Sequence, residues 1–265
     1  MRRLAPLLLA CLPGFAAAET EVDLELFLAV DVSRSMTPRE LEIQRRGYAE
    51  ALVSREVVSA IERGLLGRIA LTYVEWAGAA SQRVVVDWTL IESRADAEAF
   101  AEKITAHFED AMRRTSISGA IDYATWAFDE NGFQGLRRVI DISGDGPNNQ
   151  GRTVTDARDE ALAAGIVING LPLMTKEGMG AQWHLDDLDV YYRACVTGGP
   201  ASFVVPVLDW ADFPTAVRRK LVQELATAAP VARPANFHQP QRPAYDCLIG
   251  ERIWDRYFRD WMENP

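Results

Sequence analysis

Short apolar runs of strand length alternate along this chain with longer segments in which apolar residues recur every three or four positions. The strand-length runs lie at residues 24–30, 69–76, 138–142 and 166–171, with a shorter one at 202–206. Nearly continuous apolar runs are typical of strands covered on both faces, as in parallel sheets. One more run, at 83–88, follows a turn at Gly78 and Ser81, and it predicts an antiparallel hairpin strand at the sheet edge.

The segments between these runs carry helix signals. Thr37, Pro38 and Glu40 form a capping box with proline at the first helical position, and the repeat that follows predicts one long helix to about Arg63. Further helices are predicted at residues 94–107, 119–128, 153–164, 185–195, 210–226 and 248–262. Strands that alternate with helices predict an α/β fold, a doubly wound and mostly parallel sheet with helices on both faces and one antiparallel edge strand.

The first 18 residues have the pattern of a secretory signal peptide. Arg2 and Arg3 precede an apolar stretch at 4–12, and Ala16–Ala18 offers small residues for cleavage. The stretch is too short to span a bilayer. The sequence therefore predicts a periplasmic or extracellular protein without a transmembrane segment. A lipid anchor at Cys11 and an apolar N-terminal strand are the alternatives.

The rest of the chain divides into a domain at 19–226 and a tail at 227–265. Residues 227–243 are rich in proline and alanine, which is typical of a linker or an extended wrap. The last predicted helix has one apolar face, made of Ile253, Trp254, Tyr257, Phe258 and Trp261. We expect this face to pack on the domain, with a partner or a membrane surface as the alternative.

Net charge limits the classes of partner that the protein can bind, and the cysteine content predicts a disulfide. The chain has a net charge of −10, and residues 1–18 carry two arginines and no acid, so the processed chain is more acidic still. Such a protein is poorly suited to bind nucleic acid or anionic lipid. Processing would remove Cys11 and leave Cys195 and Cys247, an even pair that predicts one disulfide between the domain and the tail. Two separate thiols are the alternative.

Oxygen-bearing side chains follow the ends of two predicted strands. Asp31, Ser33 and Ser35 alternate directly after the first strand, Asp145 lies between two glycines after a later strand, and Thr115 precedes a helix. Ligands of open α/β sheets bind outside the carboxyl ends of the strands, and hard cations such as Mg²⁺ and Ca²⁺ take oxygen ligands. We therefore expect these five residues to meet in one site.

This order of residues resembles the von Willebrand factor A domain with its metal-ion-dependent adhesion site. The family pattern is Asp-x-Ser-x-Ser, a Thr before a helix, and Asp-Gly after an apolar strand, and the resemblance covers residues 22–226. It implies that Ser33, Ser35 and Thr115 contact a metal directly, while Asp31 and Asp145 act partly through water. It also implies Mg²⁺, with Ca²⁺ or Mn²⁺ as alternatives, and a protein partner whose Asp or Glu carboxylate replaces a water on the metal.

Two other stretches resemble a narrower bacterial family of secreted A-like proteins of unknown function. They are Ser-Gly-Asp-Gly-Pro-Asn-Asn at 143–149 and Val-Thr-Gly-Gly-Pro at 196–200. This second resemblance implies the fold and the site but no ligand.

Two residues near the motif need separate interpretation. Arg34 stands between the two serines, where the adhesion receptors often carry glycine. It either contacts an acidic ligand, slightly repels the metal, or is a solvated loop side chain. Asp141 interrupts an apolar strand, and a buried carboxylate needs partners. We expect it either to support the site from behind or to face a polar edge.

Patterns typical of enzymes are weak. His107, His184 and His238 have no paired spacing, Ser143 lacks the first glycine of a nucleophile elbow, and no phosphate-binding glycine loop occurs. The acids Asp186, Asp187 and Asp189 lack the spacing of a calcium loop and favour a helix N-terminus. The loop at 172–182 should overhang the site, either to set partner specificity or as a surface loop.

The sequence thus predicts a secreted, metal-dependent protein-binding domain of the adhesion type and not an enzyme. A scaffold with a purely structural metal is the first alternative, and a metal-dependent hydrolase is the second.

Overall fold

The computed structural model describes residues 19–106, 111–175, 184–226 and 245–263. Several sequence predictions lie outside these residues. They are the signal peptide at 1–18, the linker at 227–243, His107, His238 and most of the loop at 172–182.

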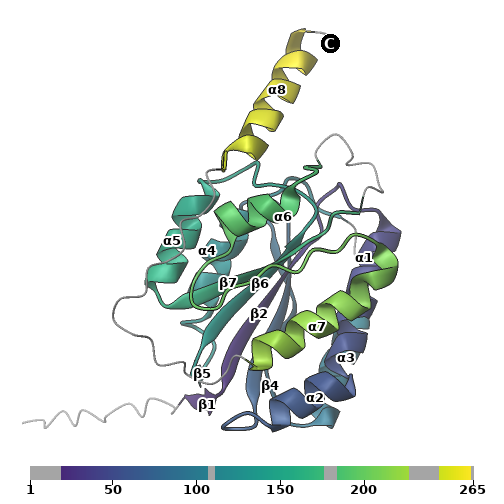
Figure 1. Cartoon of the computed structure of the whole chain (residues 1–265), viewed down its shortest axis with the longest axis vertical. Coiled ribbons are helices and arrows are strands. Elements are labelled where there is room, and N and C mark those ends of the chain that lie inside the picture. Colours follow the sequence, from purple (N-terminus) through teal and green to yellow (C-terminus); the bar gives the residue numbers. More distant parts are fainter. Residues whose placement is uncertain (1–18, 107–110, 176–183, 227–244, 264–265) are drawn as a thin grey trace, which may run out of the picture.

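The core of the molecule is a five-stranded sheet in the order β4-β3-β2-β6-β7 (Figure 1). The strands are β2 (Leu24–Asp31), β3 (Ile69–Trp76), β4 (Gln82–Ile91), β6 (Arg138–Gly144) and β7 (Ile166–Pro172). β4 pairs antiparallel with β3, and the other neighbours are parallel. Two short strands, β1 (Thr20–Val22) and β5 (Phe133–Gly135), form a separate parallel pair. The predicted α/β sheet with one antiparallel edge is confirmed.

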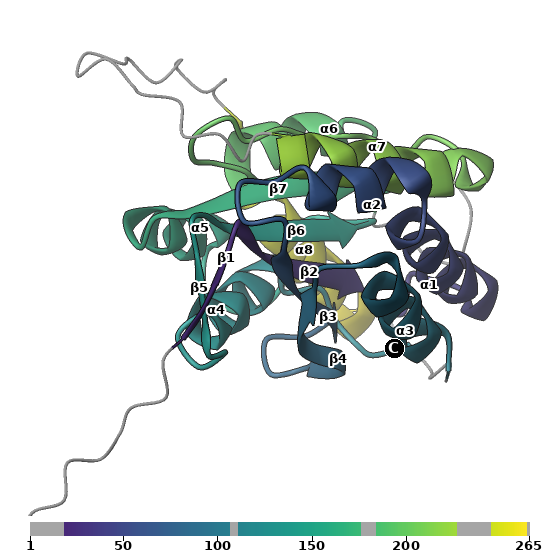
Figure 2. The same cartoon turned by 90° about the horizontal axis from the view of Figure 1, so that it is seen from below.

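Helices cover both faces of this sheet (Figure 2). One face packs against α1 (Pro38–Leu52), α2 (Arg55–Glu62), α3 (Arg94–Thr105) and α7 (Phe213–Ala226). The other face packs against α4 (Ile117–Ala127), α5 (Val154–Ala163), α6 (Leu188–Tyr191) and the π-helical segment Tyr192–Val196. β2 contributes alternate residues to the two faces, since Leu26 and Leu28 belong to one buried cluster and Phe27 and Ala29 to the other.

The start of the first long helix is confirmed, but its length is wrong. Thr37 and Glu40 form the predicted capping box of α1, which ends at Leu52 instead of continuing to Arg63. Ser54 starts a new helix there, because its Oγ accepts a hydrogen bond from the Val57 N–H at 3.3 Å and donates to the Ala51 carbonyl at 2.7 Å. Serine competes in this way for backbone groups inside a helical pattern.

Two other elements differ from the prediction. The segment at 202–206 forms isolated bridges instead of a strand, between Gly170 and Val204 and, just beyond it, between Leu173 and Val207. The predicted helix at 185–195 is one α-helical turn followed by the π-helical segment.

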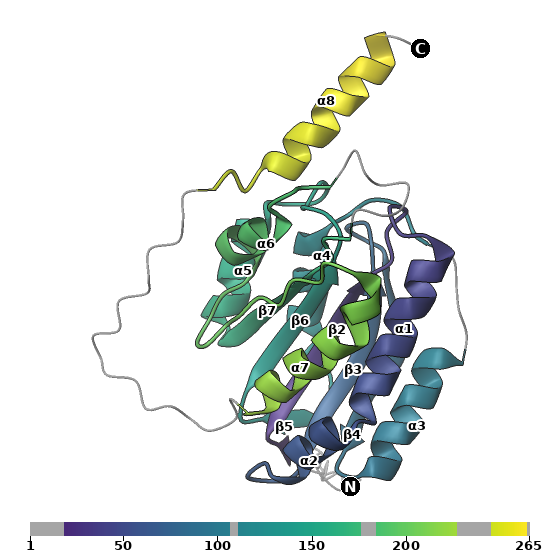
Figure 3. The ribbon, with the colours of Figure 1, turned by 45° about the vertical axis from the view of Figure 1, so that its right-hand side comes forward.

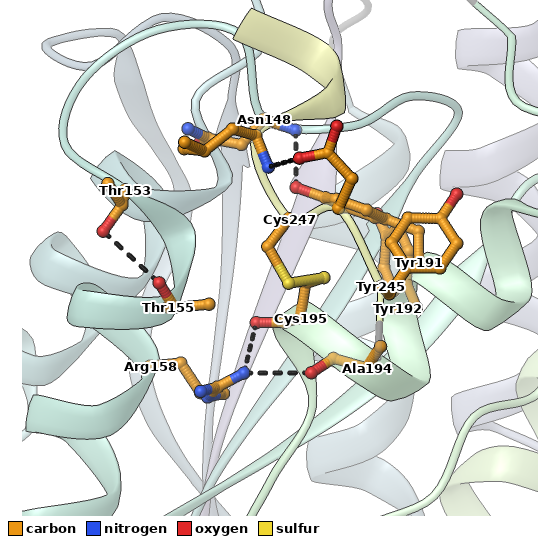
Figure 4. The surroundings of a disulfide bond; sticks show 12 residues. Asn148, Thr153, Thr155, Arg158, Tyr191, Tyr192, Ala194, Cys195, Tyr245 and Cys247 are labelled. Carbon is orange, nitrogen blue, oxygen red and sulfur yellow. Dashed lines mark hydrogen bonds between the residues drawn. A yellow bond between two sulfur atoms is a disulfide. The ribbon is translucent and has the colours of Figure 1, made fainter. Parts of the chain in front are cut away.

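The C-terminal helix α8 (Ile249–Glu263) stands at the end of the sheet where β2 and β6 finish (Figure 1, Figure 3). Cys247, just before it, forms the predicted disulfide with Cys195, with a Cα–Cα distance of 5.5 Å (Figure 4). We expected the apolar face of this helix to pack on the domain. Instead the domain contacts its first two turns, and Phe258 and Met262 are 48% and 63% exposed. Gly250 and Glu251 in the first turn of α8 contact Asn148 of the loop after β6.

None of the described helices is long and apolar enough to cross a bilayer.

Candidate metal-binding site

Three loops meet at the carboxyl end of the sheet. β2 and β6 are adjacent and parallel, so the loops that follow them, 31–35 and 144–149, lie at the same edge. The third loop, 111–116, reaches this edge through a backbone hydrogen bond from the Met112 N–H to the Val32 carbonyl at 2.8 Å. The three loops carry the five predicted metal ligands.

Asp31 is fixed and fully buried at the end of β2. Its Oδ1 accepts a hydrogen bond from the Ser33 N–H at 2.7 Å, and its carbonyl accepts one from Gln44 Nε2 of α1 at 3.0 Å. Its second carboxylate oxygen, Oδ2, is buried without a hydrogen-bond partner among the described residues. A side chain at Gly144 would approach this oxygen to 3.0 Å and the Tyr192 hydroxyl to 2.8 Å. Glycine therefore allows the backbone at the end of β6 to approach both groups closely.

The two serines connect the β2 loop to the β6 loop. Ser33 Oγ lies 2.9 Å from Ser35 Oγ, and Ser35 Oγ donates to Asp145 Oδ1 at 2.8 Å. Ser33 and Asp145 are buried, and Ser35 is half-buried. Three of the predicted ligands thus form a hydrogen-bonded chain with Ser35 in the middle.

Thr115 joins this group through Asn149. The Thr115 N–H donates to Asn149 Oδ1 at 3.1 Å, and the Asn149 N–H donates to the Thr115 carbonyl at 2.9 Å. Thr115 is 8% exposed, and it lines the same cavity of about 430 Å³ as Ser33, Ser35 and Asp145. The structure therefore brings all five predicted residues to one place, four of them as cavity walls and Asp31 beneath them.

Asn148 and Asn149 connect the loop after β6 to its neighbours by side-chain hydrogen bonds. This role was not predicted from the sequence. Asn148 Oδ1 accepts from the Ser118 N–H in the first turn of α4 at 3.0 Å, and Asn148 Nδ2 donates to Glu251 Oε1 of α8 at 2.7 Å (Figure 4). The Gly-Pro-Asn-Asn stretch contained the signal, because asparagine side chains commonly bind backbone groups in turns.

The electrostatics of the site favour a cation. Burial raises the pKa of Asp31 well above its usual value, and the nearby Asp145 raises it further. Burial also raises the pKa of Asp145, while the Ser35 hydrogen bond and His184 lower it. Two desolvated carboxyl groups that disfavour each other's charge are stabilised by a bound cation.

His184 is a residue to which the sequence analysis gave no role in this site. Its Nε2 lies 3.9 Å from Asp145 Oδ2, and its side chain is 13% exposed. Nothing in the local sequence relates it to Asp145, because the two meet only through the fold.

The donor set fits a hard divalent cation. All candidate ligands are oxygens, and the buried Asp31 Oδ2 has an unused acceptor position. Among the described residues no group of three or more His, Cys, Asp or Glu side chains could hold a metal. A metal here would therefore need the hydroxyls of Ser33, Ser35 and Thr115 as well as the two carboxylates.

The two residues interpreted separately have different positions. Arg34 is exposed and lines the cavity. Asp141 does not line it, and instead its Oδ1 forms a buried ion pair with Lys220 Nζ of α7 at 2.6 Å, while Lys220 also pairs with Glu224 Oε1 at 2.5 Å. Burial raises the pKa of Asp141 to about 7, with Lys220 lowering it and Glu224 raising it. Asp141 thus anchors α7 to the sheet.

The acidic stretch after the loop at 172–182 is engaged in local contacts. Asp187 accepts a hydrogen bond from the Tyr245 hydroxyl at 3.0 Å, and Asp189 pairs with Arg193. Asp187 is also the N-terminal flanking residue of α6, as predicted for a helix start.

Comparison with solved structures identifies the fold. The chain is similar to proximal thread matrix protein 1 from the mussel byssus, at 14% identity and a TM-score of 0.56, over 79% of this chain and 49% of that one. Another structure of that protein, at a TM-score of 0.54 and 14% identity, is described as having a zinc-occupied MIDAS motif, the metal-ion-dependent adhesion site.

Two bacterial structures are similar as well. The pilus adhesin SpaC from Lactobacillus rhamnosus GG is 11% identical at a TM-score of 0.54, over 79% of this chain and 30% of that one. A von Willebrand factor type A protein from Catenulispora acidiphila is 14% identical at a TM-score of 0.50, over 78% and 43%. The fold is therefore that of the von Willebrand factor A domain. The chain spans about half or less of the length of these proteins.

The sequence of the chain matches one family model, described as "Protein of unknown function (DUF1194)", over residues 21–229. A search of curated proteins finds no match.

Proposed function

The chain belongs to this family of unknown function, and we propose that it is a metal-dependent protein-binding domain. In this proposal Ser33, Ser35 and Thr115 ligate a divalent cation directly, and Asp31 and Asp145 hold it partly through water. The bound cation supplies Lewis acidity toward a carboxylate of a protein partner. The chain's own residues orient the cation, exclude solvent from beneath it and leave its outer side open to the cavity.

One observation carries the proposal: Asp31, whose buried Oδ2 has no hydrogen-bond partner among the described residues, is bonded through Oδ1 to Ser33, and Ser33, Ser35 and Asp145 are linked by side-chain oxygens at an open cavity. An isolated buried carboxylate is costly unless it is paired or binds a metal. Because the proposed direct ligands are neutral hydroxyls and the two carboxylates act partly through water, the cation can still accept an incoming carboxylate as a direct ligand. Mg²⁺ is the proposed ion, with Ca²⁺ or Mn²⁺ as alternatives, because it retains exchangeable waters.

We place this function in the periplasm or outside the cell. The signal-peptide pattern at 1–18 supports that location, and so does the disulfide between Cys195 and Cys247, because disulfides persist in oxidising compartments.

The test is metal binding to the purified chain by isothermal titration calorimetry, compared with Asp31→Ala and Ser33→Ala. Asp129→Ala, an exposed aspartate at the opposite end of β6, is the matched control. We expect binding in the wild type and the control and its loss in both site variants. Partner capture should then require the metal, and capture that survives both chelator and Asp31→Ala would contradict the proposal. Metal binding without metal-dependent capture would support the structural-metal scaffold instead.

A second candidate is metal-dependent hydrolysis, which the position of His184 favours. An imidazole 3.9 Å from a proposed metal-holding carboxylate could act as a general base toward a bound water. Hydrolysis of a p-nitrophenyl ester or phosphate that follows metal occupancy and is lost in His184→Ala would select this candidate. We propose binding without a reaction, so we expect no such turnover.

A further inference from the structure

Three arginines surround the mouth of the candidate metal site. Arg34 comes from the β2 loop, and Arg113 and Arg114 come from the loop before α4, and all three are exposed and line the cavity. None of them forms an ion pair with a residue that the structure describes. The chain as a whole is acidic, with a net charge of −10. A group of unpaired guanidinium groups on such a protein makes a local positive potential.

Arg114 is held in place by its backbone and by an aromatic ring. Its φ of 76° lies in the left-handed region, which residues other than glycine rarely adopt. Its guanidinium carbon lies 3.7 Å from the centroid of the Trp254 ring of α8. Stacking on an aromatic face leaves the edge of the guanidinium and its N–H donors available to a ligand.

The first turns of α8 form another part of the cavity wall, next to Arg114. Trp254 and Tyr257 line it, and three constraints fix this wall. Glu251 accepts the hydrogen bond from Asn148, Gly250 packs so closely on the Asn148 carbonyl that a side chain there would overlap it, and the disulfide at Cys247 secures the chain before the helix. The cavity therefore has a basic wall and an aromatic wall beside the candidate metal ligands.

We propose that the occupant of this cavity is an extended peptide segment of a protein partner that carries at least two carboxylates next to an apolar side chain. One carboxylate reaches the metal, a second pairs with Arg34, Arg113 or Arg114, and the apolar side chain packs on Trp254 and Tyr257. This inference rests on the proposed function and gives it a partner class. A cavity of about 430 Å³ lies in the range of ligand sites, which is about 300–1,000 Å³.

A peptide suits this geometry better than an inorganic anion. A phosphate would use the arginines but has no apolar group to pack on Trp254 and Tyr257, which line the same cavity. Carboxylates spaced along an extended chain can reach the metal and the arginines at once, and guanidinium groups bind carboxylates through paired N–H donors.

The experiment measures peptide binding to the Mg²⁺-loaded full chain by calorimetry or fluorescence anisotropy. The probes are two end-capped peptides, Leu-Asp-Glu-Asp with three carboxylates and Leu-Asn-Glu-Asn with one. We expect the first to bind at least about tenfold more tightly. The difference should disappear in the triple variant Arg34→Gln, Arg113→Gln, Arg114→Gln and persist in Arg63→Gln, an exposed arginine at the far end of α2. Trp254→Ala should weaken both peptides.

Three results would overturn the inference. They are equal affinity for the two peptides, an unchanged preference in the triple variant, and displacement of the peptide by inorganic phosphate at equal concentration. In each case Mg²⁺ binding and metal-dependent binding of the one-carboxylate peptide would still stand, so the proposed function would survive. Loss of Mg²⁺ binding itself would instead refute the proposed function.

Discussion

At the scale of single residues, Asp31 has opposite effects on stability and on binding. Its buried Oδ2 lacks a partner among the described residues, and burial raises its pKa, so the ionised side chain destabilises the metal-free fold. The same charge attracts a cation when one is present. Residues whose pKa is strongly shifted by burial are often found at functional sites.

Asp31→Asn tests this directly, since asparagine keeps the shape and removes the charge. We expect the variant to be more stable than the wild type in chelator, by about 1–3 kcal/mol, because an unpaired buried charge is lost. We also expect its metal affinity to fall by about 100-fold or more. Thermal melts with EDTA and titration with Mg²⁺ measure the two effects. A variant that is destabilised in EDTA would contradict this account of Asp31.

The pH dependence of metal binding follows from the same two carboxyls. The pKa values of Asp31 and Asp145 are both raised in the fold, so the native metal-free protein holds protons that the unfolded chain has released. Its stability should therefore rise as pH falls from neutral toward about 4, the ordinary aspartate range. Metal affinity should fall over the same window, because metal ligands must be deprotonated. Melting curves with and without Mg²⁺ across this range should converge at the acid end, and curves that diverge there would be the opposite result.

The sequence was enough to predict the candidate metal ligands, but it did not predict the side chains that surround them. Asp31, Ser33 and Ser35 follow one strand within five residues, so their grouping is readable from spacing alone, and Thr115 and Asp145 followed from family pattern and strand order. His184 and the Lys220 partner of Asp141 were missed. His184 and Lys220 lie far in sequence from the aspartates that they contact. A short-range sequence pattern cannot predict contacts of this kind.

At the scale of elements, the sequence predicted where a helix is capped at its start, but it did not predict where a helical pattern is interrupted. The capping box of α1 and the strand limits of β3 follow from residue type. The end of α1 at Leu52 depends on whether Ser54 caps a new helix or faces solvent within an old one, which spacing does not decide. The position of α8 depends on Asn148 and on Cys195, the disulfide partner of Cys247, and both lie far from the helix in sequence.

The buried ion cluster shows how α7 is fixed to β6. Lys220 is fully buried and lies between Asp141 of β6 and Glu224 of its own helix, and Asn169 Nδ2 also donates to Glu224 Oε1 at 3.2 Å. Removing the cation would leave two carboxylates without their shared counter-ion inside the core. A buried pair that is broken in this way costs far more than an exposed one.

Lys220→Met should therefore destabilise the protein by about 3–5 kcal/mol, measured by chemical denaturation. Lys103→Met, on the exposed side of α3, is the control and should change stability by less than about 0.5 kcal/mol. Adding Asp141→Asn to Lys220→Met should recover part of the loss, because one uncompensated charge is removed. No recovery would indicate that packing of the lysine stem, rather than charge, sets its contribution.

At the scale of the whole molecule, the site belongs to two parts of the chain. The candidate metal ligands come from the domain at the carboxyl edge of the sheet, and one wall of the cavity comes from α8, which follows Cys247. The disulfide closes a loop of 52 residues between these parts. In the chain-entropy description a loop of this length is worth about 4 kcal/mol relative to the open chain. We therefore expect the aromatic wall of the cavity to depend on oxidation, whereas the candidate metal ligands depend only on folding of the domain.

The double variant Cys195→Ser, Cys247→Ser separates the two parts. Cys195 is buried against the sheet, so the domain should lose stability, by up to about 4 kcal/mol, while Asp31, Ser33, Ser35 and Asp145 keep their loops. We expect Mg²⁺ affinity to stay within about threefold of the wild type. Binding of the three-carboxylate peptide should fall with the loss of the aromatic wall, and limited proteolysis should cut near α8 earlier than in the wild type.

The control is wild-type protein treated with reductant, which should reproduce this result if the disulfide is the cause. If peptide binding and proteolysis remain unchanged in both, the contacts of Glu251 and Trp254 hold α8 without the disulfide, and the tether is dispensable for the site.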